Sequence, residues 1–161
     1  MRGLPALGSV IYVHRKRYFV PSYCHYGVYT GNGKVVHFAP ASGIILRKTR
    51  IHETTMEDFL DGDKDFFVRH FPADIEEFKL LIRAKEKNAS IVDAVWQGLE
   101  WQNYHIYTPE ETVQRAYACA ESQTLGGYSL PSNNCEHFAI YCKTNLRYSD
   151  QVGRVLDLVF I

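Results

Sequence analysis

Two β-type runs separated by a glycine-rich turn constrain this fold more than any other feature of the sequence. The runs CHYGVYT (24–30) and KVVHFA (34–39) are rich in β-branched and aromatic residues, and a Gly-Asn-Gly turn (31–33) lies between them. Such a turn supplies residues that tolerate the positive φ angles of a tight hairpin. The sequence therefore predicts an antiparallel hairpin whose two arms carry His25 and His37.

The length of the hairpin loop decides whether these two histidines share a face, because side chains alternate along a strand. A two-residue loop (32–33) would turn His25 away from His37. A three-residue loop (31–33) would pair Gly27 with His37 and make His25 a diagonal neighbour on the same face. The glycine at each end of the turn favours the longer loop, and the small Gly27 leaves room beside the two imidazoles.

The rest of the chain predicts strands followed mainly by helices. The predicted strands cover 8–14 and 43–51, with shorter candidates at DFFVRHF (65–71) and YSL (128–130). The predicted helices are MEDFL with a capping box of Thr54 and Glu57, an amphipathic helix from Pro72 to about Asn88, a helix over 91–100, one over 109–122 capped by Thr108, and one that begins at Cys135. Because strands and helices are segregated, the fold class is α+β, a small antiparallel sheet packed with helices.

Size and charge limit the classes of protein to which this chain can belong. With 161 residues, 46% of them hydrophobic, it is expected to form a single domain over 1–161. Eighteen basic and eighteen acidic residues cancel, so no field attracts nucleic acid, and a nucleic-acid partner is not expected. The sequence shows neither a signal peptide nor a long apolar run, which predicts a cytoplasmic protein with reduced cysteines.

Cys135 is the best candidate for a nucleophile. It follows two asparagines and falls in the first turn of its predicted helix, where the macrodipole favours a thiolate and the backbone amide of Cys135 can hold an oxyanion. Cys119 and Cys142 lie inside predicted helices, as buried structural cysteines do. Cys24 precedes His25 on a strand, so its side chain is expected to face the other way.

His25 and His37 are the candidate base and its partner, since a nucleophilic cysteine needs an imidazole and a third group that orients it. The alternative is that both are ordinary half-buried strand residues. His137 lies too far round the helix axis from Cys135 to act as its base. A zinc site could be composed from Cys24, His25, His37, Cys135 and His137, but their spacing is not that of zinc ligands, and neither a metal nor a cofactor is expected.

Three short segments resemble the lecithin:retinol acyltransferase-like family, a branch of the NlpC-type, circularly permuted papain-like thiol enzymes. They are HYGVY (25–29), VVHF (35–38) and NCEHF (134–138), in the family's order. The segments GSVIY (8–12) and PEETVQRA (109–116) resemble the first strand and the helix before the cysteine. The chain departs from the family at Ser9, where many relatives have an acidic residue, and over 56–103, which looks like a divergent insertion.

The resemblance implies a thiol-dependent acyltransferase or phospholipase A. Cys135 would be the nucleophile, His25 the general base and His37 the residue that orients it. The acyl group of a glycerophospholipid or another ester would form a thioester and pass to water, an amine or an alcohol. The alternatives are an amidase or peptidase with the same residues and a non-catalytic interaction module.

A lipid substrate further implies an apolar groove near Cys135 and transient contact with a membrane surface. Exposed aromatic side chains are suited to such contact, and the candidates are Tyr18, Phe19 and Trp96. The protein would then be cytoplasmic but peripheral to membranes.

Overall fold

A computed structural model describes residues 3–17, 20–40, 49–85, 103–126 and 134–149. These residues form a five-stranded antiparallel sheet with the order β4-β3-β2-β1-β5. The strands are β1 (Val10–Arg17), β2 (Val20–Gly31), β3 (Lys34–Pro40), β4 (Thr49–Thr55) and β5 (Phe67–Arg69). The helices are α1 (Met56–Leu60), α2 (Ile75–Lys85), α4 (Pro109–Ser122) and α5 (Cys135–Thr144). The predicted α+β class is therefore confirmed.

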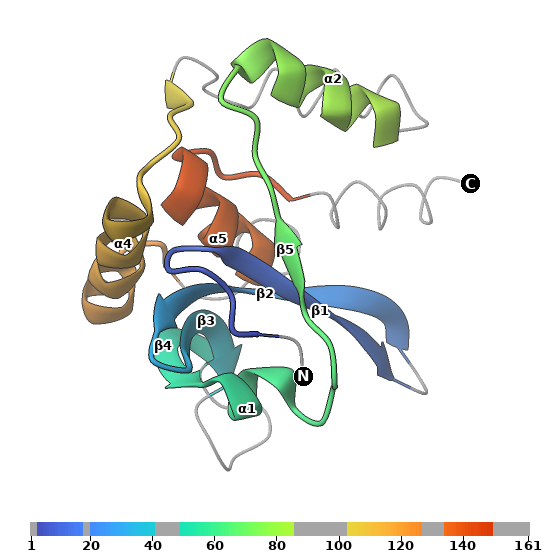
Figure 1. Cartoon of the computed structure of the whole chain (residues 1–161), viewed down its shortest axis with the longest axis vertical. Coiled ribbons are helices and arrows are strands. Elements are labelled where there is room, and N and C mark those ends of the chain that lie inside the picture. Colours follow the sequence, from blue (N-terminus) through green and yellow to red (C-terminus); the bar gives the residue numbers. More distant parts are fainter. Residues whose placement is uncertain (1–2, 18–19, 41–48, 86–102, 127–133, 150–161) are drawn as a thin grey trace.

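The two faces of the sheet bury different side chains, as the period-two alternation of the strands requires. On one face, Tyr26 and Val28 pack with residues of α4 and α5, among them Phe138. On the other face, Tyr29 and Val35 pack with Phe59 of α1. Figure 1 shows α4 and α5 away from α1, which follows β4 directly. The sheet thus separates the α1 face from the α5 face.

The hairpin between β2 and β3 has the predicted pairing but a different loop. Gly27 lies opposite His37, as the three-residue loop predicted. The turn itself, however, consists of Asn32 and Gly33, with φ of 51° and 70°, and the register shifts between Tyr29 and Gly31. The third residue of the predicted loop, Gly31, therefore belongs to β2, where the strand is irregular and Gly31 adopts a φ of 93°. The pairing of Gly27 with His37 is the same wherever the extra residue lies between them, so each histidine lies on the predicted face.

The predicted helix MEDFL is observed as α1, but its capping residue and the start of α2 were predicted wrongly. Thr55, not Thr54, caps α1, and its hydroxyl accepts a hydrogen bond from the amide of Asp58. The helix α2 begins at Ile75 rather than beside Pro72, and the carboxylate of Asp74 accepts from the amide two residues later. At α1 the sequence offers two adjacent threonines that could cap the helix, and at α2 the side chain of Asp74 satisfies an amide of the first turn.

The helices α4 and α5 begin where the sequence predicted. Thr108 and Glu111 form a capping box at the start of α4, and Pro109 occupies its first turn. Asn134 caps α5, which places Cys135 in the first turn. These two starts carry the strongest local signals in the sequence, since capping residue, proline and acidic residue coincide at α4.

Several predictions concern residues outside the described ranges. These are most of the strand predicted over 43–51, of which Thr49–Ile51 belong to β4, the helix over 91–100 and the short strand at 128–130. The candidate strand in 65–71 is observed as β5. That 56–103 is an insertion stays a prediction, although β5 places part of this segment within the sheet beside β1.

Candidate active site

The two hairpin histidines contact each other directly. Nε2 of His25 lies 2.7 Å from Nδ1 of His37. Both side chains lie on the α1 face, because Gly27 opposes His37 and His25 is two residues from Gly27 along β2. His37 is 5% exposed, so the contact is shielded from water on that side. The diagonal arrangement expected from the register is therefore present.

A threonine of β4 fixes the orientation of His37. Nε2 of His37 lies 2.9 Å from the hydroxyl of Thr54, which itself donates to the carbonyl of Thr55. Since the threonine proton is used there, His37 donates from Nε2 and accepts at Nδ1. Nε2 of His25 then donates to His37, and a neutral His25 has its lone pair on Nδ1.

Burial keeps His37 uncharged. Desolvation lowers the pKa of His37 from its ordinary value of 6.5 to about 3, and electrostatic repulsion from His52 and Arg15 acts in the same direction. A neutral ring can donate from one nitrogen and accept at the other, as the chain from His25 to Thr54 requires. His37 is thus suited to orienting another imidazole rather than to accepting a proton.

The helix α1 packs an aromatic ring against both imidazoles. The ring of Phe59, which is fully buried, lies 5.3 Å from the ring centres of His25 and His37. Arg15 of β1 ties the end of this helix to the sheet by donating to the carbonyls of Phe59 and Leu60 at 2.6 Å each. The short helix therefore acts as a rigid support for the histidine pair.

Cys135 approaches the same strand from the α5 face. The residue is 2% exposed, and its thiol donates to the backbone carbonyl of Cys24 at 3.7 Å. The backbone of Tyr26 also hydrogen-bonds to the sulfur. Cys24 and Tyr26 flank His25, and the pairing of β2 with β3 runs only from the turn to Gly27 and His37. The thiol therefore contacts β2 beyond the part that pairs with β3, at the main chain on either side of His25.

The thiol is protonated, contrary to the thiolate that the position on the helix predicted. Burial raises the pKa of Cys135 to about 12, and the carboxylate of Glu136 adds to the effect. Backbone hydrogen bonds from Tyr26, Glu136 and Cys135 lower the pKa by less. Desolvation and the adjacent negative charge thus outweigh the helix N-terminus. A thiol in this state can attack only if a base removes its proton as the new bond forms.

His137, the histidine two residues after Cys135, takes part in the cap of α5. Nδ1 of His137 accepts from the backbone amide of Asn134 at 3.2 Å. Burial lowers the pKa of His137 to about 4, and Arg147 contributes. The ring is therefore neutral and engaged at the helix start, which fits the expectation that it does not serve Cys135.

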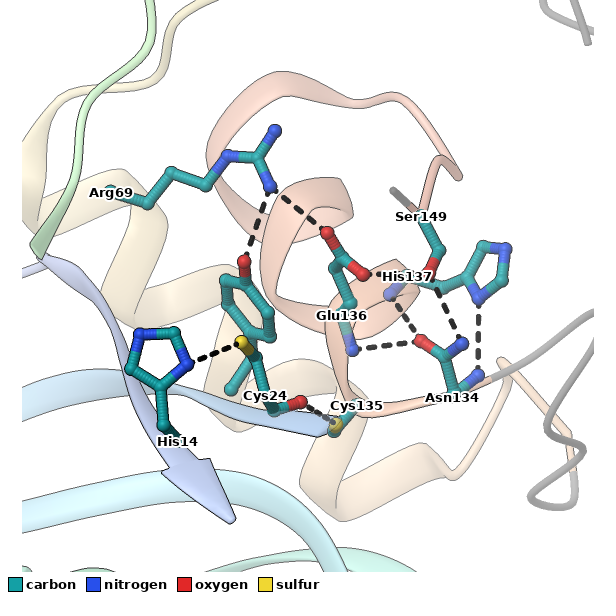
Figure 2. Close-up of polar contacts among 9 residues, drawn as sticks. His14, Cys24, Arg69, Asn134, Cys135, Glu136, His137 and Ser149 are labelled. Atoms are coloured by element: carbon teal, nitrogen blue, oxygen red, sulfur yellow. Dashed lines mark hydrogen bonds and ion pairs between the residues drawn. The ribbon is translucent and has the colours of Figure 1, made fainter. Parts of the chain in front are cut away.

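The other cysteines lie where structural side chains would be expected. Cys119 and Cys142 are buried between α4 and α5 and hydrogen-bond to each other. The thiol of Cys24 turns to Nδ1 of His14, 3.3 Å away (Figure 2). Within the described ranges, His, Cys, Asp and Glu side chains do not form a cluster of three that could hold a metal ion.

Three residues of the site were not predicted from the sequence. Thr54 was predicted to cap a helix, Phe59 was predicted only to belong to a short helix, and Arg69 had no predicted role. Arg69 lies in β5 and pairs with the carboxylate of Glu136, next to Cys135. The alternation of β4 could have placed Thr54 on the face of His37, but no local signal connects Arg69 with Glu136.

The parts of the prediction that concern membranes lie largely outside the described residues. Tyr18, Phe19 and Trp96 are among the residues that the structure does not describe. In the described part of the chain, every helix is too short or too polar to cross a bilayer. The apolar groove near Cys135 and the contact with a lipid surface stay predictions.

Comparison with known proteins gives one family. The family model described as lecithin retinol acyltransferase matches residues 4–148. Lecithin retinol acyltransferase of Mus musculus is 28% identical over 178 residues, which cover 96% of this chain and 61% of that protein. Phospholipase A and acyltransferase 2 of Homo sapiens is 28% identical over 163 residues, which cover 98% of this chain and 82% of that protein. The chain thus spans about three fifths of the length of the mouse relative.

Proposed function

The chain belongs to the lecithin retinol acyltransferase family, and from this premise we propose that it is a thiol-dependent acyltransferase or phospholipase A. The proposed substrates are glycerophospholipids or related acyl esters, and the acyl group passes to water, an amine or an alcohol. Relatives named as acyltransferases and as phospholipase A support an enzyme of this kind. The observation that carries the proposal is the position of the Cys135 thiol against the main chain that flanks His25.

In the first half of the proposed reaction, the sulfur of Cys135 attacks the ester carbonyl while His25 accepts the thiol proton. The base has to act during the attack, because the thiol is protonated at neutral pH. His37 holds His25 through the 2.7 Å hydrogen bond and is itself held by Thr54. The backbone amide of Cys135 is the proposed donor to the oxyanion.

The attack gives a tetrahedral intermediate, and its collapse breaks the ester bond. The lysophospholipid leaves with the proton that His25 returns to its oxygen, and the acyl group stays on Cys135 as a thioester. In the second half, His25 takes a proton from the acceptor, the acceptor attacks the thioester, and the proton returns to the sulfur. One difficult transfer is thereby divided into two easier ones, and the enzyme ends in its starting state.

Hydrolysis of a short-chain phosphatidylcholine tests this function. We expect the wild-type protein to release fatty acid and lysophospholipid, and Cys135→Ser to reduce this release at least about 10³-fold. Cys119→Ala is the matched control, because it removes a buried thiol of α4 and should leave the rate unchanged. Thermal unfolding of each variant verifies that it is folded.

The same assay separates the proposal from its alternatives. Turnover of amide substrates without turnover of the phospholipid would identify an amidase or peptidase and refute lipid ester cleavage. Equal phospholipid turnover by the wild type and Cys135→Ser would refute the thiol mechanism. Absence of turnover on both classes of substrate would favour an interaction module.

A further inference from the structure

A buried ion pair lies next to the candidate nucleophile and is not explained by the roles described above. Nη1 of Arg69 lies 2.9 Å from Oε1 of Glu136, and the side chains are 10% and 0% exposed. Glu136 follows Cys135 directly in the first turn of α5, while Arg69 ends β5. Burying two charges is costly, so a pair retained at this position calls for a reason beyond stability.

The second oxygen of Glu136 connects the ion pair to the helix cap, as Figure 2 shows. Ser149 donates to Oε2 of Glu136 at 2.7 Å, and the amide group of Asn134 donates to Ser149 at 3.3 Å. The carbonyl oxygen of the Asn134 side chain accepts from the amides of Glu136 and His137 at 2.9 and 3.1 Å. The carboxylate and the N-cap therefore form one connected set of hydrogen bonds around the start of α5.

Arg69 also reaches the strand that carries His25. Its guanidinium donates to the hydroxyl of Tyr26 at 3.3 Å and lies 5.4 Å from the ring centre of Phe71. The backbone of Tyr26 contacts the sulfur of Cys135, and Val10 of β1 pairs with Arg69. One side chain thus links β5, β2 and the first turn of α5, the elements that surround the thiol.

We propose that Arg69 is a positioning residue that acts through Glu136 to set both the placement and the acidity of the Cys135 thiol. The inference rests on the proposed function only in taking Cys135 as the reacting thiol. Arg69 donates to the carboxylate of Glu136 and to the hydroxyl of Tyr26, and its effect reaches the thiol through these two groups.

The electrostatic part of this role follows from the positions of the charges. The carboxylate of Glu136 disfavours the thiolate of Cys135, and the guanidinium beside it offsets that charge. Tyr26 of β2 is a titratable group that faces this pair, and Cys24 of the same strand lies near Tyr26 in turn. Burial raises the pKa of Tyr26 far above its ordinary value, so its hydroxyl is uncharged and acts only as a hydrogen-bonding group. The charge of Arg69 therefore balances that of Glu136.

The proposal predicts opposite effects for the two halves of the ion pair. Glu136→Gln removes the negative charge and leaves the positive one, which favours the thiolate. Arg69→Met does the reverse. We expect the alkylation of Cys135 by iodoacetamide at pH 9.5 to be about fivefold faster in Glu136→Gln and about fivefold slower in Arg69→Met. At this pH an unpaired buried carboxyl, whose pKa can reach about 8–9, is ionised.

The rate is measured on the peptide that contains Cys135 by mass spectrometry, because the chain has three other cysteines. Arg69→Lys keeps the charge and should bring the rate back to within about twofold of the wild type. Arg115→Met is the matched control. Arg115 binds the carbonyls of Tyr141 and Cys142 at the other end of α5, so its loss weakens the same helix without a charge near Cys135.

The sign of the two changes distinguishes this role from a structural one. A merely structural ion pair would predict rates that change in the same direction in Glu136→Gln and Arg69→Met, and in Arg115→Met as well. That result, or a slower or unchanged rate in Glu136→Gln, would overturn the proposal. If Arg69→Met does not fold, Glu136→Gln and Arg69→Lys still decide the question. No lipid is used, so failure of the proposed function leaves this result interpretable.

Discussion

The two faces of the sheet hold their parts of the candidate site by different interactions. On the α1 face, His25, His37 and Thr54 form a chain of hydrogen bonds, and the middle ring is uncharged. On the α5 face, Cys135 lies at a helix start that is held by the charges of Arg69 and Glu136. The proposed proton acceptor is thus arranged by hydrogen bonds, whereas a buried ion pair takes part in arranging the proposed proton donor.

The contacts on the two faces also differ in the sequence separation of their partners. The partners on the α1 face are 12 and 17 residues apart, within one hairpin and the next strand. The partners on the α5 face are 67 and 111 residues apart. The histidine pair is therefore a product of local strand register, whereas the position of the thiol depends on the folding of the whole sheet.

Removal of the proposed base, on the α1 face, should cause the largest loss of turnover. We expect His25→Ala to lower phospholipid turnover by about 10²–10⁴-fold, because the protonated thiol then has no acceptor for its proton. The measurement is fatty acid release, with thermal unfolding as a check on the fold. His105→Ala, at an exposed loop position, should keep the wild-type rate. Equal losses in both variants would contradict the assigned base.

Acid should destabilise the α1 side through His37. Its pKa is about 3 in the folded protein and near 6.5 when exposed, so the unfolded chain binds more protons between these values. Stability therefore falls as pH decreases from about 6.5 towards 3, by about 2 kcal/mol at pH 5 from this group. Urea unfolding of the wild type and His37→Asn at pH 7.5 and pH 5 measures the effect. An equal pH dependence in the variant would refute it.

His137 provides the corresponding test on the α5 side. Its pKa is lowered to about 4, so its contribution has the same sign and is lost as pH falls from about 6.5 towards 4. We expect His137→Asn to reduce the acid sensitivity of stability independently of His37→Asn. Urea unfolding of the double variant should show the two reductions as additive, and a double variant no less acid-sensitive than either single variant would contradict this.

A methyl group at Gly27 should disturb the register that aligns the histidines. A Cβ at this position would lie 2.6 Å from Cγ1 of Val35, 3.0 Å from the ring of Phe59 and 3.2 Å from Cβ of His37. We expect Gly27→Ala to lower the free energy of unfolding by about 1–3 kcal/mol and to reduce turnover. Gly3→Ala, where a Cβ meets no atom within 4 Å, is the control. Equal stability of the two variants would show that the site can relax.

The smallest expected effect on turnover distinguishes two adjacent threonines, Thr54 and Thr55. Thr54→Val removes the hydrogen bond to His37 and should lower turnover about fivefold, and because it leaves a buried N–H without its acceptor it should also lower the free energy of unfolding by about 1–3 kcal/mol. Thr55→Val removes the cap of α1 and should lower the free energy of unfolding by about 1 kcal/mol without that loss of turnover. Turnover and urea unfolding of both variants measure this, and identical behaviour would contradict the roles assigned to them.

The difference between the faces also explains what could be predicted from the sequence. The hairpin register, the start of α4 and the place of Cys135 in α5 depend on local signals, and these predictions were confirmed. The ionisation of Cys135 was predicted wrongly, because burial and the charge of Glu136 depend on packing. Arg69 was missed for the same reason, since no local pattern relates β5 to α5.

The central claim is that Cys135 carries the acyl group, and its most direct test is the intact mass of the protein after brief incubation with a short-chain phosphatidylcholine. The wild type, quenched during the first turnovers, should gain the mass of one acyl chain, and digestion should place this mass on the peptide that contains Cys135. Cys135→Ala should gain none and should release no fatty acid. An adduct of the same mass on the variant, or sustained turnover by the variant, would contradict the account.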